Sequence, residues 1–366
     1  MIGGATPELV GRAIETRDSL PGTRGFAGEL PDGRLVRDVL GRHPLFVDGD
    51  LDAAGDTDWS FDHRDLADPT SVPAGIVLAD GERRQVWTLP DPDPVADEQE
   101  AVGAVREAIS AALSDAPDAA VAFSGGVDSS VVAAGTDGPL YVAGFPDSHD
   151  LEAATDAGRA LDRDLRVVEL SLSTVEDAVP RVARAIGRTN AMDVSIALPL
   201  FLVGERAAAD GAERLAVGQG ADELFGGYAK VAKAPSDPRV DAETVRRARR
   251  EVVTTLPDQL ERDVQAVRAA GVEPVAPLLD DRVIAAALAL PGNLLVDDRG
   301  ERKVALRRAA RELVPARVAF REKKAVQYGS NVSRELDRLA RQAGFKRRMD
   351  DHVSQYIRAR LENTRG

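Results

Sequence analysis

The spacing of hydrophobic residues along the chain changes near residue 95. Before that point, short apolar runs such as residues 75–79 (GIVLA) and 85–89 (QVWTL) are separated by turn-forming residues such as those at 80–81 (DG). This pattern is typical of short β-strands. Residues 90–94 (PDPDP) predict a linker, because proline and aspartate do not extend a central strand. We therefore expect a small β-rich domain over residues 1–95.

From residue 98 onward, apolar runs with strand character alternate with stretches of helical spacing. Strands are expected at residues 119–123, 140–145, 166–172 and 214–217. Helices are expected at residues 98–113, 128–134, 151–160, 175–187 and 194–210. The alternation predicts an α/β fold, with a parallel sheet that carries helices on both faces. Beyond residue 241 we expect a mostly helical C-terminal part.

Composition narrows the class of protein. The chain has 366 residues, of which 43% are hydrophobic and 30% charged, so it can bury a large core. It contains no cysteine, which excludes a disulfide framework, a thiolate metal site and a cysteine nucleophile within these residues. Its most apolar stretch, residues 194–204, is far shorter than the ~20 residues that span a bilayer. The N-terminus shows no signal-peptide pattern, so we expect a cytoplasmic protein with no membrane partner.

The net charge of the chain narrows the possible partners further. Acidic residues number 61 and Lys plus Arg 47, for a formal net charge of −14. Such a chain repels nucleic acid, so no nucleic-acid partner is expected. Only six of the basic residues are lysine. Acid-rich, lysine-poor surfaces suit high salt, where ions screen the self-repulsion of the chain, and we expect a halophilic protein.

Residues 124–130 (SGGVDSS) form the first motif with chemical content. They follow the first expected strand of the parallel sheet and precede a helix. Adjacent glycines let the backbone approach a ligand closely, and the free amides of a helix start attract phosphate. Ser124 and Ser129 add hydroxyls, and Asp128 suits a metal ion that bridges phosphates. No lysine follows the glycines, so this is not a Walker loop; the alternative is a plain glycine-rich turn.

Residues 217–228 (VGQGADELFGGY) form the second motif, after the fourth expected strand of the parallel sheet. Open α/β sheets place ligands at the carboxyl ends of their strands. Gly218 and Gly220 allow close backbone approach, and Asp222 and Glu223 supply the carboxylates of a magnesium site. The alternative is a helix start at which the two acids interact with the helix dipole.

A third set of residues lies nearer the C-terminus. Arg262 belongs to it, and so does the cluster at residues 321–324 (REKK). Lys323 and Lys324 are adjacent in a chain with few lysines, and an ammonium there suits charge stabilisation on phosphorus. The alternative is a solvated pair on a loop.

Together these segments resemble the synthetase domain of asparagine synthetases. Residues 124–130 resemble the pyrophosphate loop of that family, and residues 217–228 resemble its SGEGADELFGGY segment. Three further stretches are similar: 146–154 (PDSHDLEAA), 262–280 (RDVQAVRAAGVEPVAPLLD) and 313–330 (LVPARVAFREKKAVQYGS). The loop alone would also fit other ATP pyrophosphatases, such as NAD and GMP synthetases and tRNA-modifying ligases.

The resemblance implies an ATP pyrophosphatase fold of the adenine-nucleotide α-hydrolase type over residues 98–366. It implies ATP and Mg²⁺ as cofactors, aspartate and ammonia as substrates, and asparagine formation through β-aspartyl-AMP. The residues it assigns to pyrophosphate and magnesium are Ser124, Gly125, Gly126, Asp128 and Ser129, with Asp222 as a second magnesium ligand. Those it assigns to the adenine site are Ala122, Ala143 and Gly218. Arg262 and Lys323 would stabilise charge on the reacting phosphate, with Gln219 near the nucleophile.

Residues 37–48 (RDVLGRHPLFVD) are similar to the RD-x-LG-x-x-PL segment of class II glutaminase domains. The nucleophile of that family is an N-terminal cysteine, whereas here Ile2 follows position 1 and no cysteine exists. We expect residues 1–95 to be a degenerate, truncated and catalytically silent glutaminase-like domain. The nitrogen would then come from ammonia or from a separate glutaminase subunit, and a homodimer is a further possibility for the assembly.

Gln219 stands where the asparagine synthetase family has a glutamate that is thought to help the nitrogen nucleophile lose a proton. Glutamine cannot act as a general base near pH 7. Two alternatives therefore stay open: a related amide ligase that adenylates another carboxylate, and a non-catalytic ATP-binding homologue.

Overall fold

The structure is a computed structural model of the chain, and it describes residues 1–51, 58–79, 81–116, 118–146, 148–234, 244–321 and 330–363. The chain forms two compact units, each built from several stretches of sequence. Unit 1 comprises Met1–Ala116, Gly218–Glu261 and Ala276–Ala319. Unit 2 comprises Pro117–Val217, Arg262–Val275 and Phe320–Gly366.

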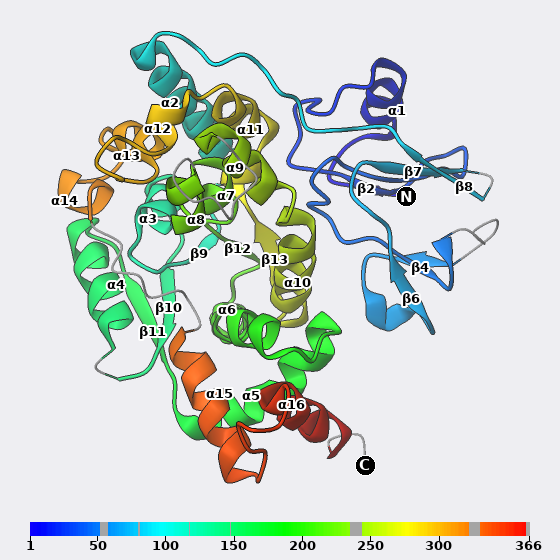
Figure 1. Cartoon of the computed structure of the whole chain (residues 1–366), viewed down its shortest axis with the longest axis vertical. Helices are drawn as coiled ribbons and strands as arrows, with labels where there is room; N and C mark the ends of the chain where they lie inside the picture. The colour runs from blue at the N-terminus through cyan, green and yellow to red at the C-terminus, as the bar shows by residue number, and fades with distance from the viewer. Residues whose placement is uncertain are drawn as a thin grey trace. The chain divides into compact units, whose positions relative to one another are not determined.

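Unit 2 is built around a five-stranded parallel sheet with the strand order β11-β10-β9-β12-β13 (Figure 1). Its strands are β9 (Ala120–Ala122), β10 (Leu140–Gly144), β11 (Leu165–Glu169), β12 (Arg214–Ala216) and β13 (Glu273–Val275). All five residues of β10 are buried, as expected for a strand covered on both faces. The predicted α/β fold and its four predicted strands are confirmed.

The described chain beyond residue 241 is mostly helical, as predicted, and β13 is a short strand within it that was not expected. It lies at the edge of the sheet, where Pro274 is tolerated because a proline there need not donate a ladder hydrogen bond. Three residues, one of them proline, carry no alternating pattern from which a strand could be read.

Some helices of unit 2 pack on its sheet, and others pack on neighbouring helices. They are α3 (Val127–Ala134), α4 (His149–Ala160), α5 (Leu172–Ile186), α6 (Ala191–Ala209), α15 (Ser330–Gln342) and α16 (His352–Asn363). Helix α4 packs on β10 and β11, and α6 packs on β9 and β10. Ser148, Ser171 and Asn190 start α4, α5 and α6, and each side chain accepts a hydrogen bond from a backbone amide of the first turn.

Taken singly, no helix in the described ranges has the length and apolar composition of a membrane span. Helices α5 and α6 meet that test only as a pair, which is bent by 104° at the break between them.

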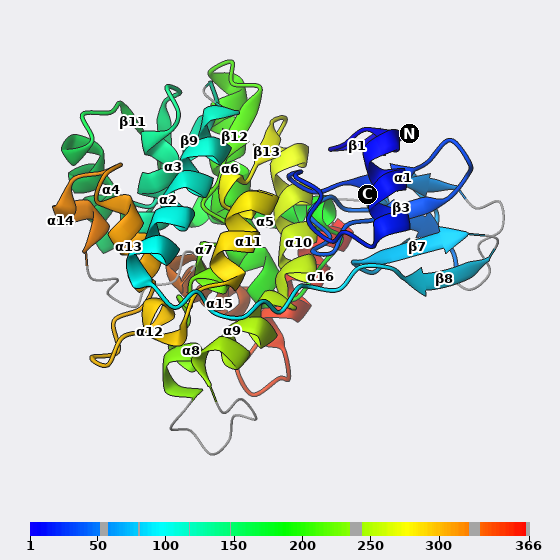
Figure 2. The same cartoon turned by 90° about the horizontal axis from the view of Figure 1, so that it is seen from above.

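The N-terminal part of unit 1 is rich in β-structure, as predicted. One antiparallel sheet has the order β1-β2-β3-β7-β8 (Figure 2). A second has the order β5-β4-β6. The strands are β1 (Ile2–Gly3), β2 (Ala27–Glu29), β3 (Leu35–Arg37), β4 (Phe46–Asp48), β5 (Trp59–Ser60), β6 (Pro69–Ser71), β7 (Ile76–Ala79) and β8 (Glu82–Gln85). Apolar side chains from both sheets, among them Leu35, Val47 and Leu78, form a common core.

Two local features of this region differ from the prediction. Helix α1 (Pro7–Thr16) was not expected; Thr6 caps its first turn. The apolar run 85–89 is not a strand, because β8 ends at Gln85. Trp87 is nevertheless buried: its indole Nε1 donates to Ala13 O at 3.2 Å, and its ring meets Phe26 edge-on. Tertiary packing, not strand pairing, accounts for the hydrophobicity of that run.

The rest of unit 1 is helical. Its helices are α2 (Glu98–Ser114), α7 (Ala221–Leu224), α8 (Ala229–Lys233), α9 (Val245–Val253), α11 (Asp281–Leu288), α12 (Gly292–Leu295), α13 (Val304–Ala310) and α14 (Ala316–Ala319), and α10 (Leu256–Ala269) begins there. Helix α2 packs against α11 and α13. The predicted linker has no regular structure and is held to α9: Arg250 donates to Leu89 O and Pro90 O, and Arg246 donates to Pro92 O.

Candidate active site

The loop 124–126 connects β9, the central strand of the parallel sheet, to helix α3. Gly125 has φ +72°, and a Cβ there would lie 2.6 Å from Ala153 O in helix α4. Only glycine combines this left-handed backbone with so close an approach. Gly126 then begins α3 without a side-chain cap, which leaves the first amides of the helix to bind some other acceptor.

Two serines shape this loop. Ser129, which is buried in the first turn of α3, accepts a hydrogen bond from Ser124 N at 3.1 Å. The two hydroxyl oxygens lie 3.2 Å apart. Asp128 is half-buried in the same turn. The structure therefore brings the predicted loop residues together at the carboxyl end of β9, with an exposed hydroxyl at Ser124.

The candidate adenine residues lie on or directly after neighbouring strands. Ala122 ends β9 and pairs with Tyr141 of β10. Ala143 lies further along β10 and is buried. Gly218 follows β12 after one residue, Val217, whose amide donates to Val275 O. Strands β9, β10 and β12 are parallel neighbours, so their carboxyl ends reach one edge of the sheet.

Within unit 1, Asp222 is paired with a lysine that sequence reasoning missed. Asp222 Oδ1 lies 2.7 Å from Lys303 Nζ, and Lys303 is buried. Gly220 begins α7 with φ +85°, and a Cβ there would overlap the side chain of Leu279. Lys303 had one signal in the sequence: it is one of six lysines in a chain that otherwise uses arginine.

Glu223, next to Asp222, points into the protein. It is buried and accepts a hydrogen bond from Tyr228 OH at 2.6 Å. Burial raises the pKa of the Glu223 carboxyl and, together with the charge of Glu223, that of the Tyr228 phenol. Gln219 is half-buried ahead of this turn. The two acids of the four-residue helix α7 thus lie in different environments. Asp222 forms an ion pair with Lys303, and Glu223 accepts a hydrogen bond from Tyr228.

Arg262 lies on α10, in the part that belongs to unit 2. Its guanidinium forms a two-point contact with Asp263, at 2.6 and 3.0 Å, and Nη1 donates to Asp193 Oδ1 at 3.0 Å. Burial opposes the ionised form of Asp193, but hydrogen bonds from Asn190 and Arg262 outweigh it, so the pKa of this carboxyl is lowered. The two aspartates likewise raise the pKa of Arg262 against the effect of burial. Arg262 is therefore a permanent cation held between two carboxylates.

The donor chemistry of Asp128 and Asp222 fits a magnesium ion. Asp128 in unit 2 and Asp222 in unit 1 each supply carboxylate oxygens, which Mg²⁺ prefers. Among the residues that the structure describes, no group of three or more His, Cys, Asp or Glu could hold a metal ion. Lys323, which is predicted to be catalytic together with Arg262 and Gln219, lies outside the described residues.

The central strand with its glycine- and serine-rich loop defines an α/β protein whose candidate functional segments follow strands β9 and β12. Residues 101–250 and 235–361 match the family model of asparagine synthase. The chain belongs to the asparagine synthase family, which confirms the resemblance drawn from its motifs.

Relatives include a Methanocaldococcus jannaschii protein provisionally named glutamine-hydrolyzing asparagine synthetase 1, which is 31% identical over 266 residues. The match covers 63% of this chain and 49% of the relative. Asparagine synthetase B of Escherichia coli is 27% identical over 354 residues, which cover 87% of this chain and 63% of the relative. The chain thus spans between about half and just under two thirds of the length of these relatives.

Proposed function

We propose that this chain catalyses the synthetase reaction of an asparagine synthetase, the ATP-dependent amidation of aspartate with ammonia. A side-chain carboxylate oxygen of aspartate attacks the α-phosphorus of ATP, the bond from that phosphorus to the bridging oxygen breaks, and pyrophosphate leaves. Ammonia then attacks the acyl carbon of β-aspartyl-AMP, loses a proton, and displaces AMP.

The observation that carries this proposal is the loop at the end of β9 in a chain of the asparagine synthase family. Gly125 turns the backbone, Ser129 braces Ser124, and α3 starts without a side-chain cap. Backbone amides and hydroxyls aimed at one place suit a pyrophosphate group. Asp128 and Asp222 would hold Mg²⁺, which would neutralise charge on the phosphates. The backbone near Ala122, Ala143 and Gly218 would line the adenine.

Arg262 and Lys323 remain the proposed cations of the reaction. Arg262 is oriented by Asp193 and Asp263, which supports a fixed positive charge of the kind that stabilises a transition state. The nitrogen source is proposed to be ammonia, because these 366 residues contain no cysteine that could attack glutamine. We propose that residues 1–95 form a glutaminase-like domain that has kept a structural role only.

Exchange of labelled pyrophosphate into ATP tests this proposal. The wild-type chain should catalyse exchange only when aspartate is present, and should form asparagine when ammonium is added. Asp128→Asn tests the role of the loop, because it keeps the side-chain shape but removes a charge that magnesium needs; exchange should fall more than about tenfold. Nucleotide binding without exchange on any carboxylate would favour a non-catalytic homologue instead.

Gln219 favours a second candidate, an amide ligase that adenylates another carboxylate. Screening carboxylates in the exchange assay separates the two, because only one class of acid should support exchange. If the chain does make asparagine, Gln219→Glu should leave exchange similar and raise the ammonia-dependent step. A slower amidation step in Gln219→Glu would mean that Gln219 is matched to a different nucleophile or substrate.

A further inference from the structure

Lys303 and Asp222 form an ion pair inside unit 1, although they are far apart in the sequence. Lys303 Nζ lies 2.7 Å from Asp222 Oδ1. Lys303 is only 3% exposed, whereas the side chain of Asp222 keeps 27% of its surface accessible. A lysine is almost never buried without a partner. The pair therefore presents an accessible carboxylate that is backed by a buried ammonium.

The surrounding backbone is shaped around this pair. A Cβ at Gly227 would lie 1.9 Å from Asp222 Oδ1 and 2.3 Å from Lys303 Cε, so only glycine leaves room for both side chains. Lys303 itself has φ +60°, a left-handed conformation that is unfavourable for lysine. Its amide donates to Leu295 O at 2.8 Å, and Arg302 donates to Gly227 O at 2.6 Å. Strain of this kind persists only where the surrounding contacts enforce it.

We propose that Lys303 is a positioning residue for Asp222, and that the pair selects a metal–nucleotide complex over a bare metal ion. This inference rests on the proposed function, in which Asp222 contacts magnesium. Lys303 holds one carboxylate oxygen in a fixed direction, so the carboxylate meets an incoming ligand already oriented.

Charge gives the selectivity. A lone aspartate attracts any divalent cation, but an aspartate that shares its charge with an ammonium attracts a bare cation less. Magnesium bound to a nucleoside triphosphate carries net negative charge, so the same ammonium favours that complex. The pair is neutral as a whole, which suits a ligand that brings both a metal ion and phosphate oxygens.

Calorimetric titration tests this without relying on turnover. The probes are Mg²⁺ alone and Mg²⁺ with α,β-methylene-ATP, an analogue that cannot release pyrophosphate. Lys303→Met should weaken binding of the complex by at least about tenfold, the size expected for loss of a charge-assisted contact, and should not weaken binding of Mg²⁺ alone. Lys230→Met is the matched control, because it removes a lysine charge from an exposed position of the same unit; both titrations should match wild type.

Gly227→Ala provides a second route, because it displaces the pair while keeping both charges, and it should also weaken binding of the complex. Thermal unfolding of each variant reports whether it folds. A double-mutant cycle with Asp222→Asn should show coupling between the two positions. Wild-type affinity for the complex in both Lys303→Met and Gly227→Ala would overturn the inference while leaving the proposed function intact. A wild-type chain that neither binds the complex nor catalyses exchange would overturn both.

Discussion

Arg262 is bound on two sides by carboxylates, and this arrangement decides how it can act. Asp263 takes two of its nitrogens, and Asp193 takes a third. Asn190, the capping residue of α6, donates to the other oxygen of Asp193 at 2.7 Å. The position of Arg262 is therefore set by the start of α6 as well as by its own helix.

Asp193→Asn should lower the free energy of unfolding by about 1–3 kcal/mol at pH 7, because a charge-assisted contact is lost. The folded-state pKa of Asp193 lies below its ordinary value, so the stability it contributes is present above about pH 4 and is lost as pH falls through the folded pKa. The difference from wild type should then shrink on acidification. Urea unfolding at pH 7 and at a series of pH values below about pH 4 measures it, and exposed Asp177→Asn should show no such difference. A difference that stays constant with pH would contradict the ionic role.

Lys323 and Lys324 are adjacent, and separate substitutions test which of them acts in adenylation. The family pattern Arg-x-Lys matches residues 321–323 and so selects Lys323 for the reacting phosphate. Lys323→Ala should reduce adenylation by roughly 10²–10³, by analogy with the loss of an oxyanion donor, and should change ATP affinity much less. Lys324→Ala should change the rate of adenylation only a few-fold. Pyrophosphate exchange measures both, and the reverse order would show that the match is off by one residue.

At the scale of elements, helix α9 is anchored through one buried arginine. Arg249 donates to Leu224 O at the end of α7, and to Ala287 O and Leu288 O at the end of α11. Burial, with help from Arg246 and Arg250, lowers its pKa to about 10, so it remains a cation at neutral pH. A cation at the C-termini of two helices is favourable, because the dipoles place partial negative charge there. This contact fixes α7, the helix that carries Asp222.

Arg249→Met should destabilise the protein by roughly 2–3 kcal/mol, since carbonyls at two helix ends lose a charged donor. Arg247→Met, on the exposed side of the same helix, should stay within about 0.5 kcal/mol of wild type. Chemical unfolding compares the two variants. Equal stability would mean that the helix ends are satisfied without Arg249.

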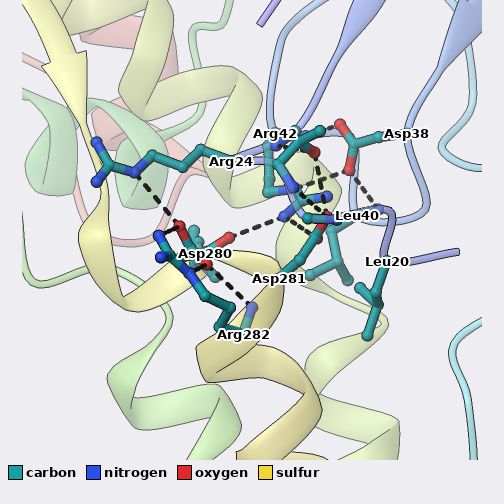
Figure 3. A network of polar contacts seen from close by, with 12 residues as sticks. Leu20, Arg24, Asp38, Leu40, Arg42, Asp280, Asp281 and Arg282 are labelled. Carbon is teal, nitrogen blue, oxygen red and sulfur yellow. Dashed lines mark hydrogen bonds and ion pairs between the residues drawn. The ribbon is translucent and has the colours of Figure 1, made fainter. Parts of the chain in front are cut away.

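At the scale of the whole molecule, the N-terminal region is tied into unit 1 by a buried ionic network (Figure 3). Arg42 binds Asp38 at 2.9 Å and Asp281 at 2.7 Å, and Asp281 also accepts the amides of Gly22 and Thr23. Asp281 begins α11, so segments from both halves of the sequence share these contacts. Arg37, which precedes Asp38 in the chain, donates to Glu261 at 3.2 Å.

Removal of residues 1–95 should therefore unfold unit 1, not merely delete an idle domain. A milder test is Arg42→Met, which leaves Asp38 and Asp281 buried with a lost partner and should cost about 3–5 kcal/mol. Arg64→Met, at an exposed ion pair of the same region, should cost less than about 1 kcal/mol. Urea unfolding measures both, and equal effects would show that the network contributes little.

Net charge acts on the molecule as a whole. At −14, unscreened repulsion among surface acids opposes the compact state, and salt weakens it. The melting temperature should rise as potassium chloride goes from low to molar concentration. Calorimetry at several salt concentrations checks this, and a melting temperature independent of salt would contradict the halophilic prediction without affecting the enzymology.

The strands of the parallel sheet and the glycine-rich loop were determined by sequence alone, because both depend on residues that are close together in the chain. The four strands β9 to β12 each coincide with an apolar run of the sequence. The loop 124–130 takes its shape from its own glycines and from the hydrogen bond between Ser124 and Ser129, five residues further along the chain. Residues that are close in the sequence are also close in the structure over such short distances. Periodicity and turn chemistry are therefore sufficient to predict these strands and this loop. The family could be recognised from the same segments, because each motif is contiguous.

Only the tertiary structure decided which distant residues meet. It paired Asp222 with Lys303, Arg262 with Asp193 and Arg42 with Asp281, and it made Glu273–Val275 an edge strand. None of these pairs has a local signature, since a buried charge is indistinguishable from a surface charge in the sequence. Its role depends on burial, which removes water and leaves partners within the protein to satisfy the charge. That condition is set by the packing of whole elements.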